Sequence, residues 1–170
     1  MLIKVHMKSP HNLPSHFPKP KKEESEFGKG KKDLLICKEC NAVYFYKSWH
    51  HRLEDYPYLK ETKNLKFTFC PACQMIKNKK FEGEVIVKNV SSKIKANLIN
   101  LIKNFGKEAF KKDPQDRVIS IIDNGSQLRI LTTENQLAQR LGKKISQVFK
   151  GRLSVSHSKG ESTLRAQVIL

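Results

Sequence analysis

Two short cysteine pairs are the residues of this chain whose type and spacing suit a defined chemistry. The pairs are Cys37–Cys40 and Cys70–Cys73, and together they contain every cysteine of the sequence. A C-x-x-C turn places two thiolates on one side of a tight loop, and two such turns supply the four sulfur ligands of a tetrahedral zinc site. Because four thiolates leave no coordination position open for water, we expect a structural zinc ion rather than a catalytic one.

Other interpretations of the cysteines fit less well. A disulfide framework suits secreted proteins, but residues 1–16 contain no apolar segment of the signal-peptide type. A thioredoxin-type redox site needs one C-x-x-C pair, whereas this chain has two of equal standing. His50 or His51 can replace one cysteine as a ligand, although packed or solvated histidines are more common. We therefore predict reduced thiols around zinc, which favours a cytoplasmic protein.

The charge of the chain points to its class of partner. The 170 residues carry a formal net charge of +17, because 33 Lys and Arg outnumber 16 Asp and Glu. Most of these cations are lysines, which act as flexible point charges toward phosphate groups rather than as bidentate readers of bases. We expect nucleic acid to be the partner rather than an anionic membrane surface. No apolar run is long enough to span a membrane, so we expect a soluble protein.

The sequence divides into three expected segments. Residues 1–33 contain four prolines and several lysine runs, which predicts a flexible basic arm. Residues 34–80 are expected to form the zinc module, with a short helix beginning near Cys73. The expected strands of this module are residues 34–36, 43–46 and 66–69. This order of elements is typical of a treble-clef-like module, although an elongated zinc ribbon has similar spacing. Residues 81–170 are expected to form a separate α+β domain.

Periodic apolar residues predict two helices in residues 81–170. The first helix follows Ser91 and is closed by Pro114. Its apolar face consists of Ile94, Leu98, Leu101, Ile102, Phe105 and Ala109. Thr133 and Gln136 fit a capping box that opens the second helix. Its expected buried stripe consists of Leu137, Leu141, Ile145 and Val148.

Five strands complete the prediction for this domain. They are expected at residues 84–88, 117–122, 127–131, 152–157 and 163–170. Asn124-Gly125 tolerates the positive φ of a tight turn and predicts a β-hairpin. The order βαββαββ predicts a split βαββαβ-type two-layer sandwich with both helices on one face of the sheet and one extra strand.

Polar strand residues are expected on the sheet face away from the helices. These residues are Arg117, Gln127, Arg129, Arg152, Ser154, Arg165 and Gln167. The face lacks the aromatic residues that stack bases in RNA-recognition motifs, so we expect contacts with phosphate and sugar and little sequence preference. Ordinary solvated strand positions explain the same pattern equally well.

Catalytic motifs are not found in the sequence. It contains no phosphate-binding P-loop, no H-E-x-x-H motif and no nucleophile elbow. The closest acidic pairs are Glu54 with Asp55 and Asp113 with Asp116, and both lie beside lysines in expected loops. Solvated charges explain these pairs better than a nuclease site, so we predict that the protein is not an enzyme and takes no small-molecule substrate.

The order of these motifs resembles one protein family. The pair Cys37–Cys40 is followed by Trp49, and Cys70–Cys73 leads into Phe-Glu-Gly-Glu-Val-Ile-Val-Lys at residues 81–88. This arrangement is similar to the N-terminal part of the large-ribosomal-subunit export adaptors of archaea and eukaryotes, the nonsense-mediated decay protein three family. In that family, a second C-x-x-C precedes a βαββαβ domain. The resemblance covers residues 34–170.

The chain also departs from the pattern of that family. It has no cysteine pairs upstream of Cys37, it has Ser126-Gln127 where Ile or Leu followed by Asp is usual, and it lacks the translation-factor-like region of larger members. The resemblance therefore does not imply export. It implies a compact, bacterial-type relative that docks on ribosomal RNA, with the large subunit favoured, in subunit maturation, quality control or dormancy.

These observations together predict a non-enzymatic, zinc-stabilised RNA-binding protein that is associated with the ribosome or its RNA. The expected zinc ligands are Cys37, Cys40, Cys70 and Cys73. The expected nucleic-acid-binding residues are Trp49, Arg52, Lys77, Lys79, Lys80, Arg129, Lys143, Lys144, Arg152 and Arg165. Two alternatives are a zinc-containing DNA-binding transcriptional regulator and a scaffold that binds an acidic protein. No helix with exposed Arg, Asn and Gln at its N-terminus is evident, which disfavours the DNA-binding regulator.

Overall fold

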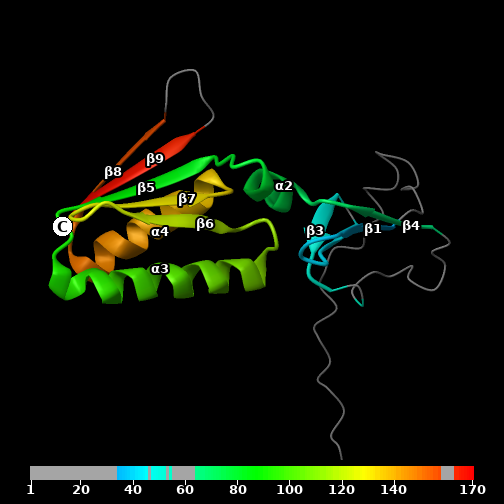
Figure 1. The fold of residues 1–170 in the computed structure, drawn as a ribbon, viewed down its shortest axis with the longest axis horizontal. Coiled ribbons are helices and arrows are strands. Elements are labelled where there is room, and N and C mark those ends of the chain that lie inside the picture. Colours follow the sequence, from blue (N-terminus) through cyan, green and yellow to red (C-terminus); the bar gives the residue numbers. More distant parts are fainter. Residues whose placement is uncertain (1–33, 46, 53, 55–63, 158–162) are drawn as a thin grey trace, which may run out of the picture. The chain divides into compact units, whose positions relative to one another are not determined.

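The computed structural model describes residues 34–45, 47–52, 54, 64–157 and 163–170 (Figure 1). The expected basic arm lies outside these described residues. The described residues belong to one compact unit that spans residues 32–170. They form a mixed α+β structure with two sheets and three helices. Among the described helices, none is both long enough and apolar enough to cross a membrane.

The first sheet contains the expected strands of the cysteine-rich segment. Its strand order is β3-β2-β1-β4, with β1 and β4 parallel and the other pairs antiparallel. The strands are β1 (Leu34–Cys37), β2 (Val43–Phe45), β3 (Ser48–His50) and β4 (Leu65–Thr68). Strand β3 was not predicted, because Ser48-Trp49-His50 lacks the run of β-branched and apolar residues by which the equally short β2 was predicted. The expected short helix follows as α2 (Pro71–Lys77).

The second sheet has the predicted succession of strands and helices, β5-α3-β6-β7-α4-β8-β9. Its strands are β5 (Gly83–Lys88), β6 (Val118–Asp123), β7 (Leu128–Thr132), β8 (Arg152–His157) and β9 (Leu164–Ile169). The spatial order is β6-β7-β5-β9-β8, so the last strand in the sequence lies beside β5 and the preceding strand forms the edge. This placement suits the residues, because β9 alternates buried apolar side chains whereas β8 is largely polar.

Helices α3 (Ser92–Lys112) and α4 (Asn135–Phe149) lie on the same face of the second sheet (Figure 1). They bury their apolar stripes against alternate residues of the strands. The fully buried members of this core include Val85, Val87, Leu98, Ile102, Leu128, Ile130, Leu141 and Ile145. The other face of this sheet, here called the open face, carries the intervening strand residues.

Three details of the sequence prediction are wrong. Glu134, and not Thr133, occupies the N-cap position of helix α4, because the Thr133 hydroxyl oxygen accepts the backbone N–H of Arg117 at 2.9 Å and its proton is donated to the Gln115 carbonyl at 2.6 Å. Val148 is 49% exposed, since Phe149 packs against the core in the last turn of the helix. Arg117 precedes β6, and its guanidinium stacks on the Phe110 ring at 3.6 Å rather than joining the other arginines on the open face.

Candidate metal centre

The four cysteines converge in the structure and can hold a metal ion. Their sulfur atoms all lie within 4.8 Å of one another, and Cys40 Sγ is 3.7 Å from Cys70 Sγ. Four sulfurs around a tetrahedral zinc ion at roughly 2.3 Å lie about 3.8 Å apart. Cys37, Cys70 and Cys73 are buried and Cys40 is partly exposed. Among the described residues, this is the cluster with the donor set and spacing of a metal site.

The first cysteine pair is shaped by the end of β1. The backbone N–H of Cys37 donates to the Ala42 carbonyl at 2.7 Å, and that of Asn41 donates back to the Cys37 carbonyl at 3.0 Å. Asn41 has a φ of 59°, in the left-handed region that Asn tolerates better than most residues. These contacts close a tight turn between β1 and β2, which brings Cys40 back beside Cys37.

The second pair opens helix α2. Strand β4 pairs with β1 in parallel, with Thr68 opposite Cys37, so the chain reaches Cys70 close to the first turn. Cys70 is the N-cap of α2, and its sulfur accepts the backbone N–H of Cys73 at 3.5 Å. Pro71 follows at the start of the helix, where its missing N–H costs little and its fixed φ suits the first turn.

The electrostatics of the four thiols are uneven. Burial alone would raise the pKa of Cys37, but backbone N–H groups around its sulfur outweigh burial and lower that pKa to about 6. One of these donors is the backbone N–H of Cys70, at 3.3 Å from the sulfur. Burial raises the pKa of Cys70 and Cys73, and neighbouring thiols contribute to the shift at Cys73. Cys37 therefore binds a cation readily as a thiolate. Cys70 and Cys73 bind it only when the metal displaces their thiol protons.

A buried donor beside the cluster also fits a thiolate ligand. Gln115, in the loop after α3, accepts the backbone N–H of Ala72 through Oε1 at 3.2 Å. Its Nε2 is buried and has no hydrogen-bond partner within the described part of the chain, while its side chain acts to lower the pKa of Cys70 against the larger effect of burial. Thiolates on a metal accept such N–H donors, so the residues present fit a thiophilic ion and are consistent with zinc.

The nearby histidines and Trp49 have other contacts. His50 stacks on the Phe45 ring, with 3.8 Å between ring centroids, and His51 packs edge-on against Phe110 at 4.6 Å. Both imidazoles therefore pack against aromatic rings, which is a more common role for histidine than metal ligation. Trp49 lies on β3, 5.3 Å from the Tyr44 ring, and packs partly buried beside the cysteines. The tryptophan thus contributes to the packing around the metal centre.

The predicted nucleic-acid-binding residues fall on several surfaces. By strand alternation, Arg129, Arg152 and Arg165 share the open face, whereas exposed Lys143 and Lys144 lie on α4, which covers the opposite face. Four other predicted residues belong to the cysteine-rich segment, namely Arg52, Lys77, Lys79 and Lys80, and Lys77 Nζ is 4.5 Å from the centroid of the Phe69 ring. The structure therefore brings Arg129 and Arg165 together and places Arg152 further along the same face, opposite Ile169, while the lysines lie elsewhere.

A buried carboxylate organises two of these arginines. Glu84, on β5, has a side chain that is only 3% exposed, and its two oxygens accept hydrogen bonds from Arg129 Nε and Arg165 Nε. Burial opposes ionisation of this carboxyl, but the two guanidinium groups outweigh burial and lower the pKa of Glu84. The ionised trio keeps one net positive charge and fixes both guanidinium groups on the open face.

The roles of Glu84 and Gln115 were not predicted from the sequence. Glu84 interrupts the apolar run of β5, which signals a special role, but its partners lie on β7 and β9 and depend on strand pairing. Gln115 carries no signal in the sequence, because a glutamine after a proline is ordinary in a loop.

No known protein family, curated protein or solved structure matches this chain.

Proposed function

We propose that this chain is a non-enzymatic RNA-binding protein that docks on ribosomal RNA, with zinc on Cys37, Cys40, Cys70 and Cys73 as a structural ion. In this proposal the cysteine-rich segment is a treble-clef-like module, in which a tight turn and the first turn of a helix each supply two ligands. The second sheet with its two helices is a split βαββαβ-type sandwich with an extra strand. Zinc stabilises the module and takes no part in chemistry.

The three arginines of the open face carry this proposal. Arg129 and Arg165 flank Glu84, and Arg152 lies on the edge strand β8, which pairs with β9. Guanidinium groups fixed before binding lose less conformational freedom when they contact a phosphate than mobile lysines do. The described strands β5 to β9 contain no Phe, Tyr or Trp, and Phe81, before β5, has its ring centroid 5.5 Å from the Arg129 guanidinium carbon. Phosphate and sugar contacts with little sequence preference follow from this arrangement.

The net charge and the resemblance noted in the sequence support the same partner. A charge of +17 attracts a polyanion over a distance of about one Debye length. The order of two C-x-x-C pairs and the following βαββαβ-like domain resembles the ribosomal-subunit adaptors. We therefore favour ribosomal RNA of the large subunit over other RNA, with a role in maturation, quality control or dormancy in the cytoplasm.

Sedimentation of a tagged protein in sucrose gradients tests the proposal directly. At low salt, the protein is expected in the ribosomal fractions, and ribonuclease treatment is expected to release it. A protein that stays at the top of the gradient contradicts the proposal. A complex that survives nuclease points instead to a protein partner, and tighter binding to DNA duplexes than to structured RNA points to a DNA-binding regulator.

Two double variants locate the RNA contacts. Arg152→Gln with Arg165→Gln removes two charges from the open face, and Lys143→Gln with Lys144→Gln removes two from α4. If RNA lies on the open face, the arginine variant lowers the slope of log K against log salt by about 1.4 to 1.8, while the lysine variant changes it little. Equal effects of the two variants mean diffuse attraction without a defined face. Circular dichroism confirms that each variant is folded.

A further inference from the structure

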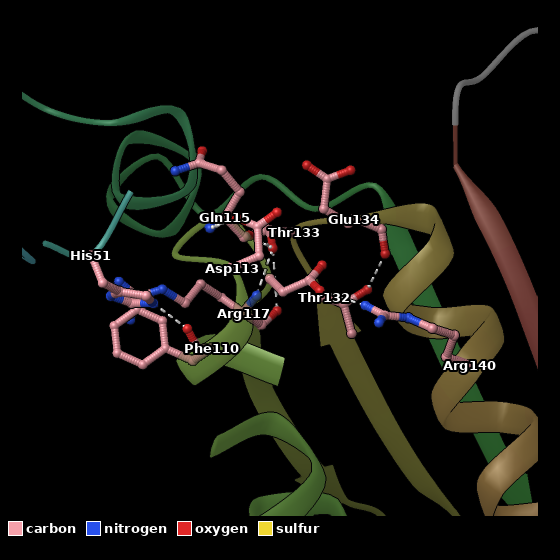
Figure 2. A network of polar contacts seen from close by, with 10 residues as sticks. His51, Phe110, Asp113, Gln115, Arg117, Thr132, Thr133, Glu134 and Arg140 are labelled. Carbon is pink, nitrogen blue, oxygen red and sulfur yellow. Dashed lines mark hydrogen bonds and ion pairs between the residues drawn. The ribbon is translucent and has the colours of Figure 1, made fainter. Parts of the chain in front are cut away.

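Gln115 lies in the loop between α3 and β6, and its side chain, labelled in Figure 2, contacts the backbone N–H of Ala72 in the first turn of α2, the helix that carries Cys73 and is capped by Cys70. Its backbone is anchored on both sides, because its N–H donates to Asp113 Oδ1 at 2.8 Å and its carbonyl accepts the Thr133 hydroxyl at 2.6 Å. Thr133 also accepts the backbone N–H of Arg117 at 2.9 Å. The direction of the Gln115 side chain is therefore set by the second sheet and its helices, and not by the cysteines.

The carboxamide of Gln115 meets the first turn of α2. Its Oε1 accepts the N–H of Ala72, one of the helix N-terminal donors that have no partner within the helix. This contact fixes which end of the carboxamide is oxygen, so Nε2 is left as a buried donor without a hydrogen-bond partner among the residues that the structure describes. Buried side-chain donors are rarely left unpaired in native proteins. Cys70 is the N-cap of the helical turn that Gln115 contacts through Ala72, and its sulfur is an acceptor that becomes strong when a metal converts it to a thiolate.

We propose that Gln115 is an outer-sphere partner of the metal centre, in which Nε2–H donates to the metal-bound Cys70 thiolate while Oε1 holds the Ala72 N–H. One carboxamide then fixes both a ligand sulfur and the helix that carries it. Partners of this kind orient the ligands of a metal, and their loss typically lowers metal affinity 10- to 100-fold. This inference does not rest on the proposed RNA binding, because it concerns only the metal and the chain.

The position of Gln115 makes one contact between the cysteine-rich segment and the second sheet depend on metal. A neighbouring contact does not: His51 Nε2 donates to the Phe110 carbonyl, and the Phe110 ring packs against both the imidazole and the Arg117 guanidinium (Figure 2). Metal binding therefore adds the hydrogen bond from Gln115 to Cys70 beside side chains that already pack against one another without metal. Metal removal is expected to increase hydrogen exchange at residues 113–117 more than at the centre of β5.

Two substitutions separate the donor from the acceptor of this carboxamide. Gln115→Glu keeps an oxygen for the Ala72 N–H and loses the donor to Cys70, and Gln115→Met loses both groups without adding charge. The matched controls are Gln74→Glu and Gln74→Met, since Gln74 is exposed on α2 next to Cys73. In competition with a chromophoric zinc chelator, both Gln115 variants are expected to bind zinc 10- to 100-fold more weakly, and the controls within about threefold of wild type.

Cobalt substitution supplies a readout that a packing role alone does not change. Loss of an N–H donor raises the energy of the sulfur lone pairs, so the thiolate-to-cobalt charge-transfer band of both Gln115 variants is expected at longer wavelength, with the controls unchanged. The inference is overturned if the folded Gln115→Met protein keeps wild-type zinc affinity and the wild-type band. It is equally overturned if wild-type protein binds neither zinc nor cobalt. If Gln115→Met does not fold, the same two measurements on Gln115→Glu decide.

Discussion

Replacement of Glu84 by Gln is expected to destabilise the second sheet and its helices. Each Glu84 oxygen accepts a hydrogen bond from a different arginine, Arg129 or Arg165. A glutamine of the same shape keeps one oxygen, but its NH2 group faces the other guanidinium, so a donor meets a donor. The substitution thus removes one charge-assisted hydrogen bond, weakens the second, and removes the carboxylate charge that the two neighbouring guanidinium groups share.

The magnitude follows from how exposed the three side chains are. Hydrogen bonds to charged groups contribute about 1.5–3 kcal/mol, and a fully buried ion pair that loses one partner costs about 3–5 kcal/mol. Glu84 is 3% exposed, but Arg129 and Arg165 are 35% and 47% exposed, so water solvates the guanidinium groups after the change. We therefore expect a loss of about 2 kcal/mol, which lowers Tm by roughly 8–16 °C for a domain of this size.

Thermal unfolding followed by circular dichroism measures this loss, with Glu108→Gln as the matched control. Glu108 lies on α3 and pairs with Lys111 in a fully solvated position, so its substitution is expected to change Tm little. A Glu84→Gln protein with the Tm of the control refutes the reasoning. In that case the two arginines are solvated well enough to need no carboxylate, and their fixed geometry on the open face is lost as an argument for phosphate binding.

The pH dependence of the same variant tests the sign of the effect. The pKa of Glu84 is lowered in the folded protein from its ordinary value of 4.5. The stability that its ionised form contributes is therefore fully present above pH 4.5 and is lost as the pH falls through the lower folded-state pKa. Wild-type and Glu84→Gln proteins are expected to differ most near neutral pH and to converge in acid. A difference that grows in acid contradicts this linkage.

Three further outcomes are expected. Cys70→Ser removes a ligand, so elemental analysis should show loss of bound metal and hydrogen exchange should rise across residues 34–80 while the second sheet stays protected; unchanged metal content contradicts this. Gly83→Ala brings a Cβ into collision with Thr132 Oγ1 and should lower the free energy of unfolding in denaturant by about 1–3 kcal/mol or more. The control Gly142→Ala, whose Cβ has its nearest atom at 3.1 Å, should change that free energy little. Equal losses in the two variants refute the steric argument. Because the metal must displace protons from Cys70 and Cys73, whose pKa values are raised, zinc affinity measured by chelator competition should weaken steadily as the pH falls; a flat profile is inconsistent with thiolate coordination.

The sequence predicted those features that arise from local chemistry. The type and spacing of the two C-x-x-C pairs were enough to predict the converging cysteines, since each pair presents two sulfur atoms close together and a tetrahedral metal ion needs four. Helix α3 was evident from apolar residues three and four positions apart, and the β6–β7 hairpin from Asn124-Gly125, where Gly125 has a φ of 76°. The strand succession around the second sheet followed from the same periodic signals.

Features that depend on tertiary contacts were out of reach. Thr133 fits a capping box, but its hydroxyl oxygen accepts the backbone N–H of Arg117 instead, and only the fold reveals this competing donor. The strand that lies beside β5 is β9 rather than β8, because burial on the sheet selects the more apolar of two neighbouring strands. Glu84 could not be paired with its arginines from sequence, since the pairing joins residues 45 and 81 positions apart.

The placement of Glu84 changes how the high positive charge of this chain is understood. Lysines scattered over α4 and around the cysteines attract any polyanion, and salt screens that attraction within about 10 Å. Arg129 and Arg165 differ, because a buried carboxylate neutralises half of their charge and in return holds both groups in place. A chain that needed only charge would gain nothing from an acid at this position. The buried carboxylate therefore supports the proposed binding of a folded RNA. The phosphates of such an RNA lie at fixed positions, and guanidinium groups that are held in place match them better than mobile lysines do.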